Sequence, residues 1–440
     1  MSQSRTAALG AFVAELKIDD IPDDVMETAR IALTHNLSVA AAGDRLAEVA
    51  ARWASHRRGG RGARAFVSGR ELAPPDAAFV NGWLIHARAQ DDTYFPGLTH
   101  VGAATTPAVL ALAEAEGLAL REVLTAIVAG YEVAATVSRV AAASTTAHGF
   151  RGSGIYGVFG AAAGSALLLG LDAAGCAHAV GIAASMAAGT NQTWVDGSNE
   201  WQMQLGAASR SGMEAALLAY SGATGSTGAL EGSSGFFNAF ARDSALAEEV
   251  GEGLGSRWAT REVSFKAHPV CAILQAPVTA AAALACTRAE ISAATLTLTP
   301  AEAQYPGTDG VPPFEDAGAA LMSAPYCVAT ALTRGGVTVD DLFRSAEPER
   351  IDTTRRVRVV ADPHLAPRQF VLEVTWTDGR WVRLVGDGST AAWGRDDLSA
   401  SLSRLQQEVA DGIDLTVLVE CVFGSLDAPA ADLVGAVVAP

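Results

Sequence analysis

The stretch "RGSGIYGVFGAAAG" (residues 151–164) decides between two folds. Its Gly-x-Gly-x-x-Gly spacing, which begins at Gly152, is that of a dinucleotide-binding turn, where glycines let a strand-to-helix turn approach a pyrophosphate. That interpretation requires a buried strand just before the turn. The preceding residues, "SRVAAASTTAHGF" (138–150), are small and polar and contain no run of Val or Ile. The pattern therefore favours the start of a helix whose glycines, among them Gly157 and Gly164, permit close helix packing.

The composition is that of a well-buried globular enzyme and excludes several other classes. The chain has 440 residues, of which 50% are hydrophobic and 18% charged, so we expect about two or three structural domains and no extensive disorder. The formal net charge of −17 argues against nucleic acid as a partner, because phosphate binding requires a basic surface. A small anionic substrate stays compatible with this charge, since a pocket can be positive on an acidic protein.

Cysteine usage and the first residues indicate a cytoplasmic protein. The five cysteines are scattered, with no Cys-x-x-Cys pair and no His–Cys group at zinc spacing, which predicts reduced thiols and no metal site. The first residues lack a basic region followed by an apolar one, so we expect no signal peptide. The uncharged run 152–171 is diluted by Gly, Ala and Ser. It is therefore interpreted as a packed soluble helix, and no membrane is expected as a partner.

The pattern of hydrophobic residues changes along the chain. Up to about Lys266, Ala- and Leu-rich segments of helical length are separated by Gly, Pro or Asp, which is typical of a multi-helix bundle. After about residue 290 the chain becomes β-rich, and residues 369–388 hold two alternating strands around Asp378-Gly379, a hairpin signal. A single helix is predicted over 314–336. Helical patterns return from about Asp396.

We therefore predict a mainly α fold with two domains. The larger is an all-helical bundle that is discontinuous in sequence, built from residues 1–266 and 395–440. The smaller is an inserted α+β domain over residues 267–394.

The first candidate for chemistry is "AFVNGWLIHARAQDDTYFPGLTH" (78–100), in which Asp91, Asp92, Thr93 and His100 fall in a loop between two predicted helices. Adjacent carboxylates beside an imidazole can serve acid–base catalysis. The same Asp-Asp-Thr sequence is also a common helix cap. The residues alone leave both interpretations open.

The second candidate is a helix N-terminus that carries Arg151, Ser153 and Tyr156. Exposed backbone N–H groups and an arginine fork form a natural carboxylate clamp, although an arginine solvated at a helix end gives the same pattern. A third stretch places Trp201 and Gln204 near the start of another helix, and by itself it says little.

The fourth candidate, "SFKAHPVCAILQAP" (264–277), brings Lys266, His268 and Cys271 together at the predicted domain boundary. Domain boundaries often hold small-molecule sites, and the pKa of a lysine in such a cleft can fall into the working range. The alternative for Cys271 is a buried small hydrophobic residue. Tyr326 lies inside the predicted 314–336 helix, where core packing is the more common role.

Taken together, these stretches resemble the MmgE/PrpD family, which includes 2-methylcitrate dehydratase, cis-aconitate decarboxylase and iminodisuccinate epimerase. The motifs "GYEVAATVSRV", "GVFGAAAGSALLLGLD", "LGAASRSGMEAALLAYSG" and "FKAHPVC", together with the Asp-Asp-Thr stretch, occur in the family's order over roughly residues 5–335. The resemblance implies an active site between the two domains of a homodimer. It also implies proton transfer at a carbon next to a carboxylate of a polycarboxylate substrate, without metal or organic cofactor.

The resemblance also assigns roles to individual residues. Thr93, His100, Lys266 and Tyr326 stand where decarboxylase-like members place active-site residues, and Asp91 and Asp92 keep the acidic pair of the motif. This chain departs from the family pattern at five positions. Ala89 replaces an earlier acidic residue of the motif, and Arg151 and Gln204 replace two histidines. Trp201 replaces a lysine, and Cys271 replaces a further histidine.

These departures favour a simple proton exchange over elimination. An arginine does not act as a general base at neutral pH, but it can hold a carboxylate through two hydrogen bonds. We therefore expect an epimerase or isomerase similar to iminodisuccinate epimerase, with Lys266 as one base and Tyr156, His100 or Cys271 as its partner. The catalytic candidates are Lys266, His100, Tyr156, Cys271, Tyr326 and Asp92, and the substrate-binding candidates are Thr93, Asp91, Arg151, Trp201, Gln204 and His268.

Two alternatives stay open from the sequence. One is a lyase of the dehydratase or decarboxylase type with a rearranged acid–base set. The other is a non-catalytic homologue that only binds carboxylates. Trp194 and Trp201 could also give the pocket an aromatic wall for a less polar ligand.

Overall fold

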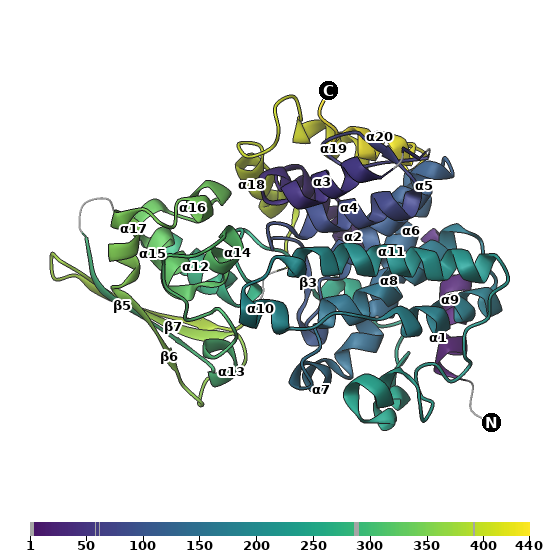
Figure 1. Cartoon of the computed structure of the whole chain (residues 1–440), viewed down its shortest axis with the longest axis horizontal. Coiled ribbons are helices and arrows are strands. Elements are labelled where there is room, and N and C mark those ends of the chain that lie inside the picture. Colours follow the sequence, from purple (N-terminus) through teal and green to yellow (C-terminus); the bar gives the residue numbers. More distant parts are fainter. Residues whose placement is uncertain (1–3, 58, 61, 286–289, 390–391) are drawn as a thin grey trace.

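The computed structural model describes residues 4–57, 59–60, 62–285, 290–389 and 392–440. Two lobes are evident in Figure 1, a large helical one that carries both termini and a smaller one that contains a sheet. The fold is mainly α with a smaller α+β region, as predicted.

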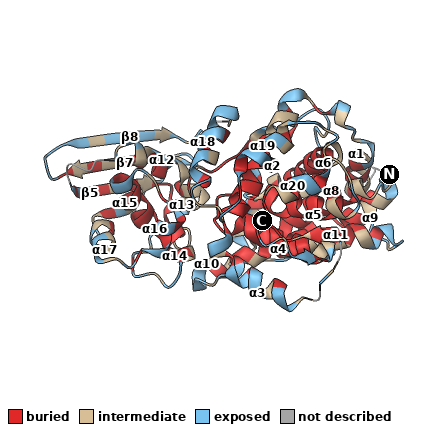
Figure 2. Cartoon of the chain, turned by 90° about the horizontal axis from the view of Figure 1, so that it is seen from above, coloured by how far each residue is buried: buried red, intermediate tan, exposed pale blue. Residues whose placement is uncertain are grey.

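The large lobe is built from the N-terminal two thirds of the chain and its C-terminal end. Its helices are α1 (Arg5–Glu15), α2 (Asp23–Ala41), α3 (Glu48–His56), α4 (Pro74–His86), α5 (Val101–Ala115), α6 (Leu120–Arg139), α7 (Ala142–Ala147), α8 (Gly152–Leu168), α9 (Ala173–Met186), α10 (Gln192–Asp196) and α11 (Glu200–Tyr220), followed after the small lobe by α18 (Arg395–Leu405), α19 (Leu415–Phe423) and α20 (Ala430–Gly435). Helices α4, α5, α6, α8 and α11 pack on one another, and Figure 2 shows that this interior is buried almost throughout.

The glycine-rich stretch forms α8, with Arg151 as its N-terminal cap residue. The segment before it is the short helix α7 followed by a turn, so the strand that a dinucleotide-binding turn requires is not there. A side chain at Gly157 would place its Cβ 2.6 Å from the Cβ of Ala104, and at Gly164 2.7 Å from Cγ2 of Val109. These glycines therefore let α8 approach α5 closely, as the sequence predicts.

The small lobe is a four-stranded sheet covered by helices. The sheet has the order β6-β5-β7-β8, in which β5 (Ile291–Leu298) pairs parallel with β6 (Val357–Ala361) and antiparallel with β7 (Gln369–Trp376), and β8 (Trp381–Asp387) completes the hairpin. Gly379 turns that hairpin with a φ of 87°. The helices are α12 (Gln275–Ala283), α13 (Pro300–Ala303), α14 (Ala317–Met322), α15 (Ala324–Arg334), α16 (Val339–Phe343) and α17 (Pro348–Thr354).

The single helix predicted over 314–336 is wrong, because the chain breaks at Ser323 into α14 and α15. The Ser323 hydroxyl accepts a hydrogen bond from the backbone N–H of Tyr326 at 3.0 Å and caps the second helix, and Pro325 stands in its first turn. A serine cap followed by a proline is a signal for a new helix start.

Two hydrophobic cores follow the two lobes. One is formed by residues between Leu9 and Phe265 together with residues between Leu398 and Val437. The other is formed by residues between Val270 and Trp376, to which the large lobe contributes Ala89 and Trp201. This distribution supports the division into residues 1–266 with 395–440 and residues 267–394, which we propose as the domain boundaries.

No helix in the described part of the chain is long and apolar enough to cross a membrane. Cys176, Cys271, Cys327 and Cys421 are free thiols, and the fifth cysteine, Cys286, lies outside the described residues.

Candidate active site

A short strand pair brings two of the sequence candidates together. Residues Thr93–Tyr94 form β3, which pairs antiparallel with β4 (Val263–Ser264), and Thr93 stands opposite Ser264. The sequence analysis placed Thr93 in a plain loop, because strands of two residues leave no periodicity to detect. The pairing delivers Lys266, two residues beyond β4, to the loop that carries Asp91.

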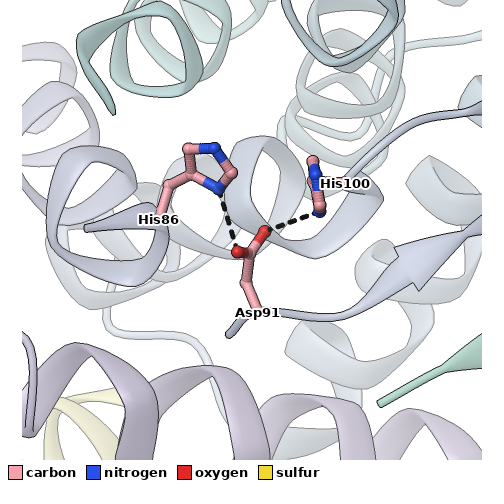
Figure 3. A group of neighbouring side chains, drawn as sticks. All are labelled: His86, Asp91 and His100. Atoms are coloured by element: carbon pink, nitrogen blue, oxygen red, sulfur yellow. Dashed lines mark hydrogen bonds and ion pairs between the residues drawn. The ribbon is translucent and has the colours of Figure 1, made fainter. Parts of the chain in front are cut away.

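Asp91 lies at the centre of the site between two imidazoles (Figure 3). Its Oδ1 accepts a hydrogen bond from Nδ1 of His86 at 2.9 Å, and its Oδ2 lies 3.2 Å from Nδ1 of His100. Burial by itself would raise the pKa of the Asp91 carboxyl, but His86, His100 and Lys266 outweigh it and hold that pKa well below its usual value. Asp91 is therefore a buried carboxylate that stays ionised.

Lys266 lies beside the same carboxylate and beside His100. Its Nζ donates to the carbonyl of Ala89 at 2.7 Å, and it lies 3.2 Å from Nδ1 of His100 and 3.8 Å from Oδ1 of Asp91. Burial lowers the pKa of Lys266, and Asp91 opposes that shift. Burial and the lysine charge also lower the pKa of His100. Burial thus shifts the pKa of both groups in the direction that favours the neutral form a general base needs.

Arg151 completes the group, and we refer to His86, Asp91, His100, Lys266 and Arg151 as the Asp91 cluster. The guanidinium donates from Nη2 to Nε2 of His86 at 2.6 Å, and from Nη1 to the carbonyl of Trp201 and to Oε1 of Gln204 at 3.3 Å. Burial lowers the pKa of Arg151 to about 10, so the group stays charged at neutral pH. It is therefore a fixed cation at the start of α8, suited to holding a carboxylate.

His86 is the member of the cluster that the sequence analysis missed. It is the last residue of α4, and burial lowers its pKa to about 3. The neutral ring donates from Nδ1 to Asp91 and accepts at Nε2 from Arg151, so it links the carboxylate to the guanidinium. The available signal was a histidine five residues before Asp91 at a helix end.

Four further candidates lie around the cluster. Oγ1 of Thr93 is 3.1 Å from Nδ1 of His100, the Trp201 ring lies edge-on to His86 with centroids 5.1 Å apart, and Gln204 contacts Arg151. Burial raises the pKa of the Cys271 thiol, which Lys266 and Arg151 partly oppose. Cys271 therefore stays protonated within electrostatic reach of Lys266 and Arg151.

Asp92 points away from the cluster although it adjoins Asp91. Its carboxylate accepts hydrogen bonds from the Tyr131 hydroxyl, from Nδ2 of Asn36 at 3.0 Å and from the backbone N–H of Gly102 at 2.8 Å. Burial raises its pKa to about 6. These contacts give Asp92 a structural place between α2, α5 and α6, so its catalytic role stays a prediction.

The structure does not bring Tyr156, His268 or Tyr326 into the cluster. The Tyr156 hydroxyl is 2.8 Å from Oγ1 of Thr145, and that of Tyr326 donates to the carbonyl of Asp341 in the small lobe. His268 lies in a cavity of about 210 Å³ with residues such as Arg404, and burial lowers its pKa to about 4. Their predicted site roles find no support in these contacts and stay predictions.

Three residues of the cluster carry donor types that suit a metal ion. The nearest ligand atoms of His86, Asp91 and His100 all lie within 4.8 Å of one another. However, both imidazole Nδ1 atoms face the one carboxylate, Nζ of Lys266 lies 3.8 Å from it, and the charged Arg151 guanidinium donates to Nε2 of His86. A dication there would be repelled by these neighbours, so the arrangement fits proton exchange and anion binding better than metal binding.

The fold and this site define a helical enzyme-like scaffold with a largely buried acid–base cluster. Residues 7–249 match the MmgE/PrpD N-terminal domain. The chain belongs to the MmgE/PrpD family, which confirms the resemblance seen in the sequence.

Its similar relatives are named as decarboxylases. A cis-aconitate decarboxylase of Aspergillus terreus is 30% identical over 291 residues, which are 62% of this chain and 59% of the relative. A cis-aconitate decarboxylase-like protein of Aspergillus oryzae is 30% identical over 60% of this chain and 58% of its own length. The human cis-aconitate decarboxylase is 35% identical over 38% of this chain and 35% of its own length. The chain thus spans less than two thirds of the relatives it matches.

Proposed function

We propose that this protein is an enzyme that transfers a proton at a carbon next to a carboxylate of a polycarboxylate substrate. The observation that carries the proposal is the contact between Lys266 Nζ and His100 Nδ1 at 3.2 Å, where Lys266 is buried, His100 is half-buried and both have lowered pKa values. Two nitrogen bases in contact can take up and pass on a proton. Arg151, fixed at the edge of the same cluster, supplies the positive charge that holds the carboxylate.

The more specific proposal is an epimerase- or isomerase-type exchange. Lys266 removes the proton from the carbon, and the Cys271 thiol or His100 returns one. The protonated thiol supports this assignment, because a raised pKa keeps the proton on sulfur until a carbanion-like centre forms nearby. Gln204 in contact with Arg151 adds a neutral hydrogen-bonding group rather than a further acid.

The second candidate is a lyase, and the names of the relatives favour it. Cis-aconitate decarboxylase activity in this chain would require Lys266 or His100 to protonate the carbon from which carbon dioxide leaves. The third reading is a homologue that binds carboxylates without turnover. The predicted homodimer, the absence of a cofactor and the cytoplasmic location stay predictions.

The test is incubation of the purified protein in D₂O with iminodisuccinate, citrate, 2-methylcitrate and cis-aconitate, followed by proton NMR. Deuterium at a carbon next to a carboxylate, with no alkene gained or lost, supports the epimerase proposal. Alkene change or release of carbon dioxide supports the lyase.

The matched variants are Lys266→Ala and Lys17→Ala, because Lys17 is an exposed lysine outside the cluster. We expect Lys266→Ala to lose turnover and Lys17→Ala to retain it. Turnover that survives in Lys266→Ala would remove Lys266 as the base. Binding of an acid by both variants without turnover in the unmodified protein would support the non-catalytic reading.

A further inference from the structure

A cavity of about 150 Å³ lies where the start of α11 meets the loop that leads into α14. In Figure 1 the neighbouring helices α10 and α14 stand beside each other at the junction of the two lobes, and Figure 2 places them side by side as well. The apolar part of its lining comprises Trp194, Trp201, Val311, Phe314 and Met322. An apolar cavity of roughly this volume is large enough to hold a benzene molecule.

The cavity shares its walls with the Asp91 cluster. The Trp201 ring lies edge-on to His86 and also packs on Trp194, with ring centroids 5.0 Å apart. The Trp194 ring in turn lies 5.2 Å from Cζ of Arg151. A ligand held by Arg151 therefore has the two tryptophans, and the cavity that they line, directly beside it.

The lining offers little to a second charged group. Asp316 is the one charged residue among the described residues that line the cavity. Its carboxylate accepts a hydrogen bond from the backbone N–H of Ala319 and caps α14. Lysine, arginine and histidine side chains are missing from this described lining. A substrate carboxylate would lose its hydration there without gaining a cation, whereas an apolar group would gain contact with the two indole rings.

Arg151 still has donors for a ligand. A guanidinium has five N–H groups, and the acceptors found for Arg151 in the described part of the chain are His86, the Trp201 carbonyl and Gln204, bound through Nη1 and Nη2. The Nε–H and one hydrogen of Nη2 are left to donate to a ligand.

We propose that the substrate of this protein carries an apolar arm, about the size of a phenyl ring, that occupies this cavity while a carboxylate is held by Arg151. This inference rests on the proposed function, since it takes the carboxylate end as the reacting end. The ligand class is therefore an aryl- or alkyl-substituted dicarboxylate, not an acid whose substituents are all charged.

The test compares succinate with 2-benzylsuccinate, which differ by the benzyl arm, in calorimetric binding to the full chain. We expect 2-benzylsuccinate to bind at least about tenfold more tightly, because the arm is removed from water. Ala319→Leu fills the cavity from α14, and we expect it to abolish the preference while the Kd of succinate stays the same. Ala319→Ser, which keeps the size of the side chain, should retain the preference.

Succinate binding by Ala319→Leu also reports whether that variant is folded. If it is not folded, Val311→Ser serves instead, because Val311 is 54% exposed at the rim and tolerates substitution. Its expected effect is a loss of a few fold for 2-benzylsuccinate alone. Equal affinities of the two acids, or a preference that survives in both variants, would overturn the inference.

Deuterium exchange on the same two acids distinguishes failure of this inference from failure of the proposed function. Exchange without any preference for the arm leaves the proposed function standing and overturns this inference. A preference in binding without exchange on any acid supports the cavity assignment and contradicts the proposed function. Failure of both acids to bind counts against both.

Discussion

Replacing Asp91 by asparagine should shift the pH dependence of proton exchange to lower pH, a change that a general loss of folded structure would not produce. Nζ of Lys266 lies 3.8 Å from Oδ1 of Asp91. At an effective dielectric constant of about 20, that charge pair is worth about 4 kcal/mol. Asp91 raises the pKa of Lys266 against the lowering by burial, so Asp91→Asn removes this support and the pKa falls further.

The expected shift follows from the sign of that change. Lys266 acts as a base only when neutral, so the exchange rate rises as pH passes its pKa. In Asp91→Asn, the rising limb of the pH–rate profile should move to lower pH by about one to three units, since the lost interaction is worth about 4 kcal/mol and one pKa unit corresponds to about 1.4 kcal/mol. The plateau rate should fall as well, because His86 and His100 lose their shared carboxylate and the amine becomes a weaker base.

The assay is the pH dependence of kcat/KM for deuterium incorporation into whichever acid is turned over. The matched control is Asp341→Asn, which also neutralises a buried carboxylate, one that pairs with Arg350 at 3.0 Å in the small lobe. This control should leave the limb in place. A limb that stays at the same pH in Asp91→Asn, or moves to higher pH, would refute the assignment of Lys266 as the titrating base.

Three further predictions concern binding and stability. Arg151→Lys keeps the positive charge but loses the paired N–H donors of the guanidinium, so the KM of a carboxylate substrate should rise about tenfold or more in steady-state kinetics. An unchanged KM would contradict the assignment of Arg151 as the group that binds the carboxylate. Gly164→Val should lower the free energy of unfolding in urea by about 1–3 kcal/mol, because its Cβ would lie 2.9 Å from the carbonyl of Ala126, whereas Gly59→Ala, which meets open space, should not. Asp92 has its folded-state pKa raised from 3.8 to about 6, so the stability it gives below pH 4 is lost as pH rises through about 6. The slope of Tm over that range should be absent in Asp92→Asn, and an identical slope would show that another group titrates.

The long helices and the β-hairpin could be predicted because their sequence patterns extend over many residues. Small residues at helical spacing over 151–164 indicated close packing of α8, and the alternation around Asp378-Gly379 indicated the β7–β8 hairpin. The break at Ser323 was missed because the apolar pattern continues through it. The cap and the proline at 325 were present, but they were outweighed by the periodicity.

The site was predictable only in part, because it is assembled from contacts that have no local pattern. Asp91, His100 and Lys266 were found from residue type and from the family resemblance. The β3–β4 pairing that places Lys266 beside Asp91 involves two residues on each side, too few to show a period. His86 was missed because a histidine on an apolar helix is usually part of the core, and its contacts with Asp91 and Arg151 appear only in the structure.

The charges of the Asp91 cluster explain how a proton transfer there can stabilise its own product. Lys266 has to be neutral before it can act as the base, and burial, which lowers its pKa, favours that form. When Lys266 accepts the proton from carbon it becomes an ammonium ion, and the substrate gains one negative charge. That new cation lies 3.8 Å from Asp91 and beside the developing enolate, in a site from which water is largely excluded. Because electrostatic attraction is strongest in such surroundings, the proton that leaves the carbon creates the positive charge that holds the intermediate.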